Sequence, residues 1–176
     1  FVAIADTVSM PQDSPHFHID FNRLVHVKRI AGGEIADGAD PSAWDGKGCG
    51  FTDGVVARKN VADKKMAIQL ANPKIMLLGC ALDMGGPTRM VGLDALLEQE
   101  ETHHNILVRK IKALGPDLVL VQKNAAGRVV TGLQEAGITL VVNVKPAVLQ
   151  RVARCTGAEV TSQIEQILNA ASTVAL

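Results

Sequence analysis

The second half of the chain alternates between short apolar segments and longer amphipathic segments, and this alternation most restricts the possible folds. The expected strands are Lys74–Leu82, Asp117–Val121, Ile138–Val144 and Ala158–Val160. The expected helices are Leu93–Leu114, Ala125–Ala136 and Ala147–Cys155. Strands that alternate with helices form parallel sheets, because each crossover helix returns the chain to the same end of the sheet. The apolar run within Lys74–Leu82 does not alternate with polar residues, which predicts a strand buried on both faces. The sequence therefore predicts an α/β fold.

Terminal signals mark the last helices of this pattern. Pro146 suits the first position of a helix, and Gly157 suits the position just after its end. Ser162 and Glu165 form a possible capping box for one further helix that ends near Asn169. These residues are therefore expected to fix the helix boundaries in the last third of the chain.

The first half of the chain is less regular. Residues 1–22 predict an irregular arm, and residues 31–50 predict a long loop rich in glycine and acidic residues. The expected elements are strands at Leu24–Ile30 and Phe51–Arg58 and a helix at Val61–Ala71 that Asn60 caps and Pro73 stops. The predicted organisation is an arm over 1–22, one α/β domain over 23–170 and a tail over 171–176. Because the chain begins with Phe1, we expect a piece of a longer protein.

The charge balance argues against nucleic acid as a partner. The chain has 18 basic and 18 acidic residues, so no global field attracts a polyanion. All four phenylalanines and the single tryptophan lie at or before Phe51, which leaves no ring to stack on bases in the rest of the chain. We therefore expect no binding to DNA or RNA.

Cysteine usage and apolar run lengths indicate a cytoplasmic protein without a membrane span. Cys49, Cys80 and Cys155 are scattered and include no C-x-x-C pair, as is typical of reduced thiols. The longest uninterrupted apolar runs, such as Ile75–Leu78 and Leu118–Val121, are far too short to cross a bilayer.

Two clusters in the glycine-rich loop contain residue types that bind ions, but neither has the spacing of a known ion site. Gly46–Gly50 lacks the Lys-Ser/Thr pair and the following helix of a phosphate-binding loop, so a flexible loop is favoured. Asp37, Asp40, Asp45 and Asp53 are irregularly spaced and no glutamate closes the set, so solvated acids are favoured over calcium ligands.

The histidines form two pairs. His16 and His18 could present two imidazoles on one face of a strand, but no third metal ligand lies near them in sequence. His103 and His104 are adjacent in the longest expected helix, where they face about 100° apart. His104 falls on the apolar stripe, so a histidine at the edge of the core is favoured over a catalytic base.

The remaining candidates are a cysteine and a group of basic residues. Cys155 lies beside Arg154 at a helix end, and a small buried thiol is favoured over a nucleophile. The basic cluster comprises Arg58, Lys59, Lys64 and Lys65. This cluster could touch a lipid headgroup or an acidic partner, although a solvated charged face is favoured. No catalytic, cofactor-binding or metal-binding residue is therefore assigned.

Five ordered blocks resemble the apical domain of group II chaperonins, the thermosome and CCT type. The blocks are Asp53–Met66, Asn72–Leu78, Leu97–Glu101, Asp117–Lys123 and Arg151–Ala158. Their order and spacing agree over about residues 51–169. The segment from Asp83 to Leu96 leaves little room for the helical protrusion of chaperonins, so the protrusion is expected to be short or missing. Gly127 and Gly132 lie inside an expected helix, where each costs about 1 kcal/mol relative to alanine.

A second resemblance is narrower. Val25–Gly33 and Gly137–Arg154 are similar to the chaperonin-like domain of phosphatidylinositol 3-phosphate 5-kinases, the PIKfyve type. Val142 and Asn143 stand where chaperonins usually carry a basic pair, whereas Gln122 replaces a glutamate that is usual in the kinase family. The kinase resemblance covers about residues 21–169, which is more of the chain than the chaperonin resemblance covers.

The kinase resemblance implies a non-catalytic regulatory domain that binds other proteins. The parent would be an ATP- and Mg²⁺-dependent enzyme that makes phosphatidylinositol 3,5-bisphosphate on the cytoplasmic face of the endosome or vacuole membrane. The implied partners are a HEAT-repeat scaffold protein and a phosphoinositide phosphatase. No catalytic residue of the family corresponds to a position in this chain, so neither cofactor is expected to bind here.

Two other functions stay open at this point. The first is the apical, polypeptide-binding domain of a group II chaperonin subunit, which the same five blocks resemble. The second is a small stand-alone enzyme on a flavodoxin-like or Rossmann-like sheet, which would need a ligand cleft at the carboxyl ends of the strands.

Overall fold

The computed structural model describes residues 25–29, 52–83, 93–162 and 174–175. The chain divides into two units, Phe1–Val56 and Ala57–Leu176. Every helix and strand described below belongs to the second unit, which is described here by itself.

The two strands expected in the first half are not found in its described residues. Val25–Arg29 and Thr52–Arg58 form no regular structure, so the predictions for Leu24–Ile30 and Phe51–Arg58 are wrong there. Val27 is 80% exposed. Alternating β-branched residues make a stable strand only when a neighbouring strand supplies hydrogen bonds and a face to pack on. Neither segment has such a neighbour among the described residues.

A largely parallel sheet forms the centre of the second unit. Its strands are β1 (Ile75–Leu78), β2 (Leu118–Val121), β3 (Thr139–Val141), β4 (Val160–Thr161) and β5 (Val174–Ala175). The parallel strands lie in the order β3-β2-β1-β4, and β5 pairs with β1 in the antiparallel direction. The predicted parallel sheet is confirmed. Each parallel strand is shorter than the segment that predicted it, and β4 also begins two residues later than expected.

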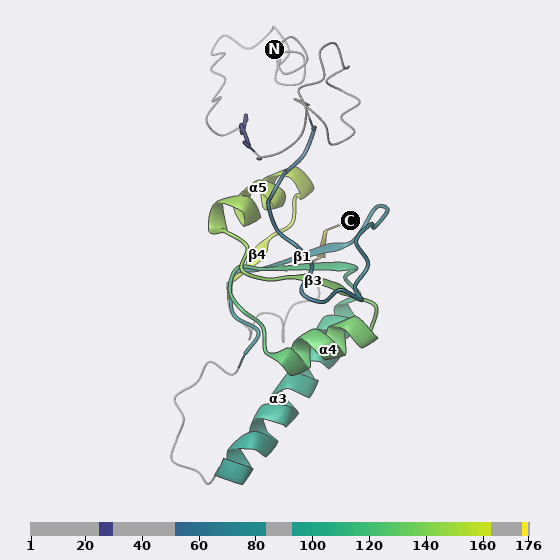
Figure 1. Ribbon diagram of the computed structural model, residues 1–176, viewed down its shortest axis with the longest axis vertical. Coiled ribbons are helices and arrows are strands. Elements are labelled where there is room, and N and C mark those ends of the chain that lie inside the picture. The colour runs from purple at the N-terminus through teal and green to yellow at the C-terminus, as the bar shows by residue number, and fades with distance from the viewer. Residues whose placement is uncertain (1–24, 30–51, 84–92, 163–173, 176) are drawn as a thin grey trace, which may run out of the picture. The chain divides into compact units, whose positions relative to one another are not determined.

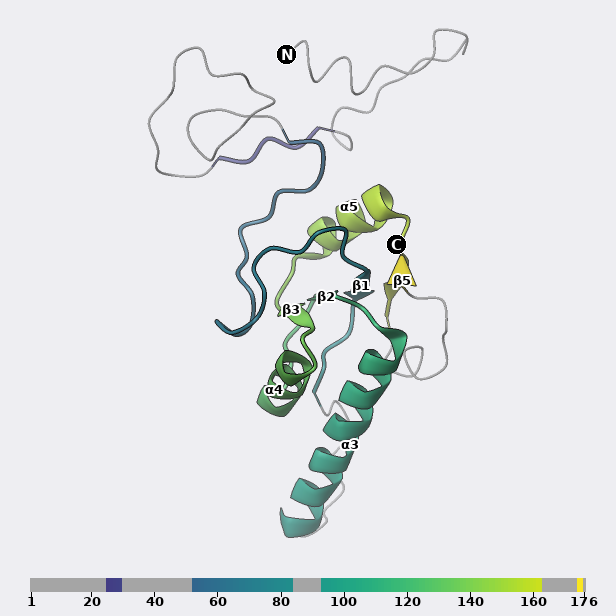
Figure 2. The same ribbon diagram turned by 90° about the vertical axis from the view of Figure 1, so that its right-hand side faces the viewer.

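Three helices cover the two faces of this sheet. They are α3 (Leu93–Leu114), α4 (Gly127–Glu135) and α5 (Pro146–Thr156). Figures 1 and 2 show α3 and α4 on one face and α5 on the opposite face. The bounds of α3 agree with the prediction, and nine residues, 84–92, separate it from Asp83. Ser162 is not helical, and the rest of the predicted last helix lies outside the described residues.

The helices bury two apolar cores, one on each face of the sheet. Met76 and Leu78 belong to the core beneath α3 and α4, which includes Ile111 and Leu133. Leu77 belongs to the core on the opposite face. Other members of that core are Val144, Leu149 and Ala158. The alternation arises because consecutive side chains of a strand point to opposite faces. None of the three β1 residues has any exposed surface, which confirms the prediction of burial on both faces.

Residues 57–74, here called the edge strap, lead from the start of the second unit to β1. The helix predicted at Val61–Ala71 is wrong, because the chain there forms turns and bends. One turn is closed by the amide of Met66, which donates to the carbonyl oxygen of Asp63 over 3.1 Å. The Asp63 carboxylate accepts a second bond, of 2.8 Å, from the amide of Lys65.

Hydrogen bonds to β3 explain why the edge strap is not helical. The amide of Ala62 donates to the carbonyl oxygen of Leu140 over 2.8 Å. The hydroxyl of Thr139 donates to the carbonyl oxygen of Ala67 over 3.1 Å, and the amide of Leu140 donates to the sulfur of Met66 over 3.3 Å. The strap thereby covers the outer edge of β3, where a bare strand would expose unpaired backbone groups. Bonds to the sheet replace those of a local helix.

Substitution of Gly157 is expected to destabilise the end of α5. Gly157 has φ 71°, a left-handed conformation that disfavours every residue with a Cβ, and an added Cβ would meet nothing within 4 Å. Gly157→Ala should therefore cost about 1 kcal/mol through backbone strain alone. We expect thermal unfolding, followed by circular dichroism, to show a melting temperature about 2–4 °C lower. Gly157→Asn should lose less, since asparagine tolerates this conformation; equal melting temperatures for wild type and Gly157→Ala would contradict the assignment.

Candidate functional site

Most of the candidate ion ligands lie outside the described residues. These are His16, His18, Asp37, Asp40, Asp45, Gly46–Gly50 and, within that last stretch, Cys49. Asp53 is described and exposed. Within the described ranges, no three His, Cys, Asp or Glu side chains gather where they could hold a metal ion. The structure therefore brings no metal centre together in this part of the chain.

The adjacent histidines of α3 have different surroundings. Their ring centroids lie 6.1 Å apart with an interplanar angle of 64°. His103 is half-buried, whereas His104 is buried at 7% exposure, somewhat deeper than the predicted place at the edge of the core. Among the described residues, neither ring nitrogen of His104 has a hydrogen-bond partner. Because no described residue gives it a hydrogen-bond partner, we interpret His104 as a packing residue rather than a catalytic base.

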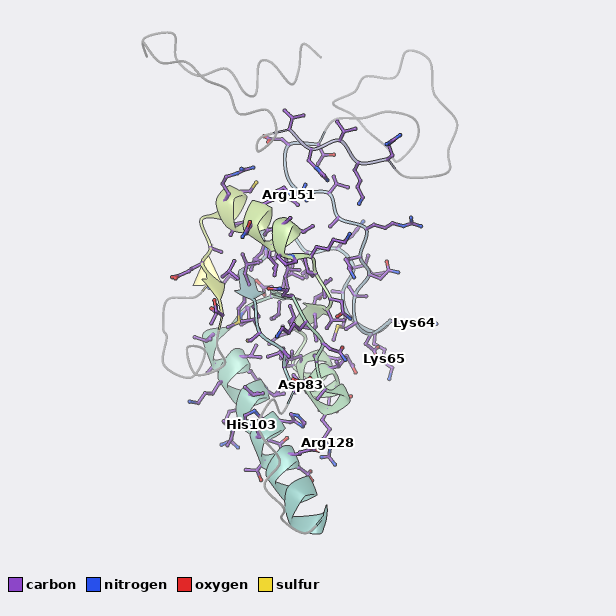
Figure 3. The ribbon with its side chains drawn as sticks, turned by 90° about the vertical axis from the view of Figure 1, so that its left-hand side faces the viewer. Lys64, Lys65, Asp83, His103, Arg128 and Arg151 are labelled. Atoms are coloured by element: carbon purple, nitrogen blue, oxygen red, sulfur yellow. The ribbon has the colours of Figure 1, made fainter. Side chains whose placement is uncertain are left out.

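His104 lies along the contact between α3 and α4, here called the α3–α4 seam. One turn before it, Glu101 pairs with Arg128 of α4 at 2.6 Å. One turn after it, Val108 lies so close to Gly132 of α4 that a Cβ on the glycine would be 2.9 Å from a methyl group. Figure 3 shows His103 and Arg128 on this side of the sheet. The ion pair is mostly exposed and contributes at most about 1 kcal/mol, so the close apolar contact dominates the seam.

Cys155 is not the buried thiol that the sequence predicted. It is exposed in the last turn of α5, whereas Cys80 is partly buried. The physical reason is helical geometry: Leu149 is the fully buried residue of α5, and Cys155 lies six residues later, on the far side of the helix. Arg154 precedes it and is also exposed. α5 contains no histidine, so no imidazole of this helix can act as a base for the Cys155 thiol.

The outward side of α5, here called the α5 face, is basic. It comprises Ala147, Gln150, Arg151 and Arg154, which recur at helical spacing. No acidic residue occurs in this helix. Arg151 is labelled in Figure 3, and its Nε donates to the carbonyl oxygen of Ala147 over 3.0 Å, which holds the side chain along the helix. This bond fixes the direction of the Arg151 guanidinium on the α5 face.

The predicted basic cluster is a second basic surface. Arg58, Lys59, Lys64 and Lys65 all lie on the edge strap and are exposed. Lys74, which the sequence prediction omitted, is exposed at the end of the same strap. Figure 3 shows Lys64 and Lys65 at the outer margin of the fold. The described residues therefore offer two basic surfaces for binding and no cluster that could hold a metal ion. Nor does any described helix combine the length and apolar character that a membrane crossing requires.

Sequence comparison identifies relatives of two kinds. A model of the TCP-1/cpn60 chaperonin family matches residues 4–174. The 1-phosphatidylinositol 3-phosphate 5-kinase of Homo sapiens is 34% identical over 152 residues, which are 85% of this chain and 7% of the kinase. The T-complex protein 1 subunit gamma of Dictyostelium discoideum is 30% identical over 169 residues, which are 92% of this chain and 30% of that subunit.

Structural comparison agrees with the family match. The open-state monomer of a group II chaperonin from Methanococcoides burtonii matches with a TM-score of 0.55 at 25% identity, covering 70% of this chain and 26% of that chain. This match confirms the predicted chaperonin-like α/β fold. The chain spans 7% of the length of the human kinase and less than a third of the chaperonin subunit. Since the family model covers nearly the whole sequence, the chain belongs to the TCP-1/cpn60 chaperonin family.

Proposed function

We propose that this chain is a non-catalytic regulatory domain that binds other proteins within a phosphatidylinositol 3-phosphate 5-kinase. The observation that carries the proposal is its 34% identity to the human kinase over 85% of its length. The matched segment is 7% of that kinase, as suits one domain of a much longer enzyme. The identity is also higher than that to the chaperonin subunit, which is 30%.

The proposed enzyme would bind ATP and Mg²⁺ elsewhere than in this domain. In support of this, the described residues include no cluster of three carboxylate, imidazole or thiol side chains that could hold a cation. The carboxylates that adjoin the strands are dispersed: Asp83 follows β1, Asp117 precedes β2, and Glu159 precedes β4. Asp117 is occupied as the acceptor of a 2.8 Å bond from the amide of Lys74. The domain would therefore take no direct part in the phosphoryl transfer.

The α5 face is the surface that we assign to a protein partner. Its two guanidinium groups can each form two parallel bonds with a carboxylate, which gives a protein interface both energy and a fixed orientation. Leu149 and the core beneath it hold the helix rigidly on the sheet. We propose a HEAT-repeat scaffold protein as the partner, together with a phosphoinositide phosphatase, on the cytoplasmic face of an endosomal membrane. The domain would thereby position the distant kinase domain.

Binding to the scaffold is expected to depend on the α5 face. The assay is a pull-down of the 176-residue chain with a HEAT-repeat scaffold protein. Arg151→Glu/Arg154→Glu should weaken binding at least tenfold, because two attractive guanidinium–carboxylate pairs would become repulsive pairs of carboxylates. The matched control is Arg109→Glu/Lys112→Glu, which makes the same charge change on exposed residues of α3. The control should bind as the wild type does.

Two results would count against this proposal. One is a folded wild-type chain that does not bind the scaffold at tens of micromolar, a concentration at which even a weak complex with a Kd in that range would be about half formed. The other is an equal loss of binding in both charge-reversed variants. Circular dichroism of each variant establishes that the sheet and helices are intact, so that a loss of binding is not a loss of fold.

The relationship to the T-complex subunit favours a second candidate function, the polypeptide-binding domain of a chaperonin subunit. This function predicts that the isolated chain suppresses the aggregation of a chemically denatured client protein at equimolar concentration. A regulatory domain of a kinase has no such requirement. Suppression by the 176-residue chain, without scaffold binding, would replace the first proposal with the second.

A further inference from the structure

The edge strap concentrates positive charge in a chain that is neutral overall. Its exposed basic residues are Arg58, Lys59, Lys64, Lys65 and Lys74. Asp63 is its single acidic residue, so five positive charges and one negative charge give the strap a net charge of +4. The ion pair of Glu101 with Arg128 lies outside the strap. Asp117 lies beside the end of the strap, where its carboxylate accepts a bond from the amide of Lys74. Five positive charges against Asp63 and Asp117 still leave a net charge of +3, which can attract an anionic partner.

An isoleucine projects from this basic segment. Ile68 is 85% exposed, which is more than any other large apolar residue of the described second unit. A single exposed apolar residue is ordinary on a protein surface. Ile68, however, follows directly after Ala67, whose carbonyl oxygen accepts the bond from Thr139, and two residues after Met66, which is buried in the core. The fold thus fixes the strap against β3 and leaves Ile68 outside it.

We propose that the edge strap docks on an anionic membrane surface. The lysine ammonium groups would lie among the lipid phosphates while their aliphatic stems reach toward the interface, and Ile68 would enter the boundary between headgroups and acyl chains. Each basic residue near an anionic bilayer contributes attraction, and an inserted apolar side chain adds a contribution that does not depend on salt. The inference goes beyond the proposed function, because it requires no protein partner.

The residue types favour a membrane over an acidic protein as the occupant. Four of the five basic residues are lysines, which act as mobile point charges, whereas carboxylate recognition in proteins favours the planar fork of arginine. A protruding Ile68 also suits a fluid interface, which opens around it, better than a protein surface, which would need a matching pocket. The α5 face has the opposite character, since its cations are both arginines.

The test is co-flotation of the 176-residue chain with vesicles. The vesicles contain phosphatidylcholine alone or phosphatidylcholine with phosphatidylserine, at low and high ionic strength. The wild type should float with phosphatidylserine vesicles at low ionic strength and less at high ionic strength. Lys64→Glu/Lys65→Glu should lower the partition coefficient about 30-fold or more, and Ile68→Ser should lower it about tenfold.

Matched controls lie on α3. Arg109→Glu/Lys112→Glu repeats the charge change, and Ile106→Ser removes an isoleucine that is 43% exposed. Both should float as the wild type does.

Failure of the folded wild type to float, or equal losses in strap and control variants, would overturn the proposal. A third result would also overturn it: the strap lysines bind polyglutamate, and phosphatidylserine vesicles do not displace the polyglutamate. That result would identify an acidic protein as the occupant. The strap variants should retain scaffold binding, and the Arg151→Glu/Arg154→Glu variant should retain flotation, so the two proposals can fail separately.

Discussion

Gly132→Ala is expected to lower the free energy of unfolding by about 2 kcal/mol, although alanine favours helices more than glycine does. A Cβ at Gly132 would lie 2.9 Å and 3.1 Å from the two methyl groups of Val108. Val108 is β-branched, so its methyl groups are restricted in a helix and cannot easily turn away. The added methyl must therefore push α3 and α4 apart and loosen the core beneath them. We expect the melting temperature to fall by about 4–8 °C.

The control for this prediction is the other glycine of α4. An added Cβ at Gly127 would meet nothing within 4 Å, and Gly127 does not have a positive φ. Gly127→Ala should therefore leave stability unchanged within about 0.5 kcal/mol or raise it slightly. Both variants can be compared by urea titration of the circular dichroism signal. If Gly132→Ala is as stable as Gly127→Ala, the two helices do not approach as closely as the seam requires.

A double variant attributes the effect to one contact. Val108→Ala shortens the side chain that an alanine at position 132 would meet, so the two substitutions together should cost at least about 1 kcal/mol less than the sum of their separate costs. Additive costs would mean that the strain at Gly132 arises elsewhere. A double variant that is more stable than the sum of the two separate costs predicts would identify Val108 as the side chain that excludes a Cβ at position 132.

Gly132 also illustrates what a sequence can and cannot predict about this fold. Helix propensity predicts only that glycine destabilises a helix at this position. The contact that makes glycine necessary joins Gly132 to Val108, which is distant along the chain, so a local pattern does not reveal it. Local preferences placed α3 at its observed bounds, since Gly115 and Pro116 end it and its apolar stripe is long. Long periodic elements are thus predictable, whereas the reason for one residue within them is a tertiary contact.

The helix predicted within the edge strap is wrong for the same physical reason. Asn60 and Pro73 are good helix boundaries, and Val61 and Ile68 are spaced to share the apolar side of a helix. The observed segment instead donates and accepts hydrogen bonds along β3, which a local pattern does not reveal. With no helix to align it, Ile68 is exposed rather than buried. The basic cluster could be predicted from composition, but its combination with Ile68 could not.

The two basic surfaces divide the proposed binding functions by chemistry. The α5 face holds Arg151 against its own helix, which reduces the side-chain entropy that a protein interface would otherwise lose. The lysines of the edge strap have no such constraint in any described contact, and a lipid surface does not require one. Binding of a scaffold and contact with a membrane could therefore act on the same domain at once, since they use different residues.

His104→Leu is expected to raise the free energy of unfolding by about 1–2 kcal/mol, which is unusual for a substitution in a core. His104 is 7% exposed, and both of its ring nitrogens lack hydrogen-bond partners in the part of the chain that the structure describes. The folded state therefore loses the water bonds of the imidazole without replacing them, a cost that leucine does not incur. Leucine also fills a similar volume and favours a helix more than histidine does.

Two further variants separate polarity from shape at this position. His104→Gln keeps a polar group in the α3–α4 seam and should therefore give none of the gain. His103→Leu changes the half-buried neighbour, whose ring still reaches water, and should alter stability by no more than about 0.5 kcal/mol. A loss of stability in His104→Leu would contradict the burial of unpartnered nitrogens. A gain in stability that is confined to His104→Leu would show that the buried histidine destabilises the α3–α4 seam. The close contact between Gly132 and Val108 would then hold α3 and α4 together despite this destabilisation.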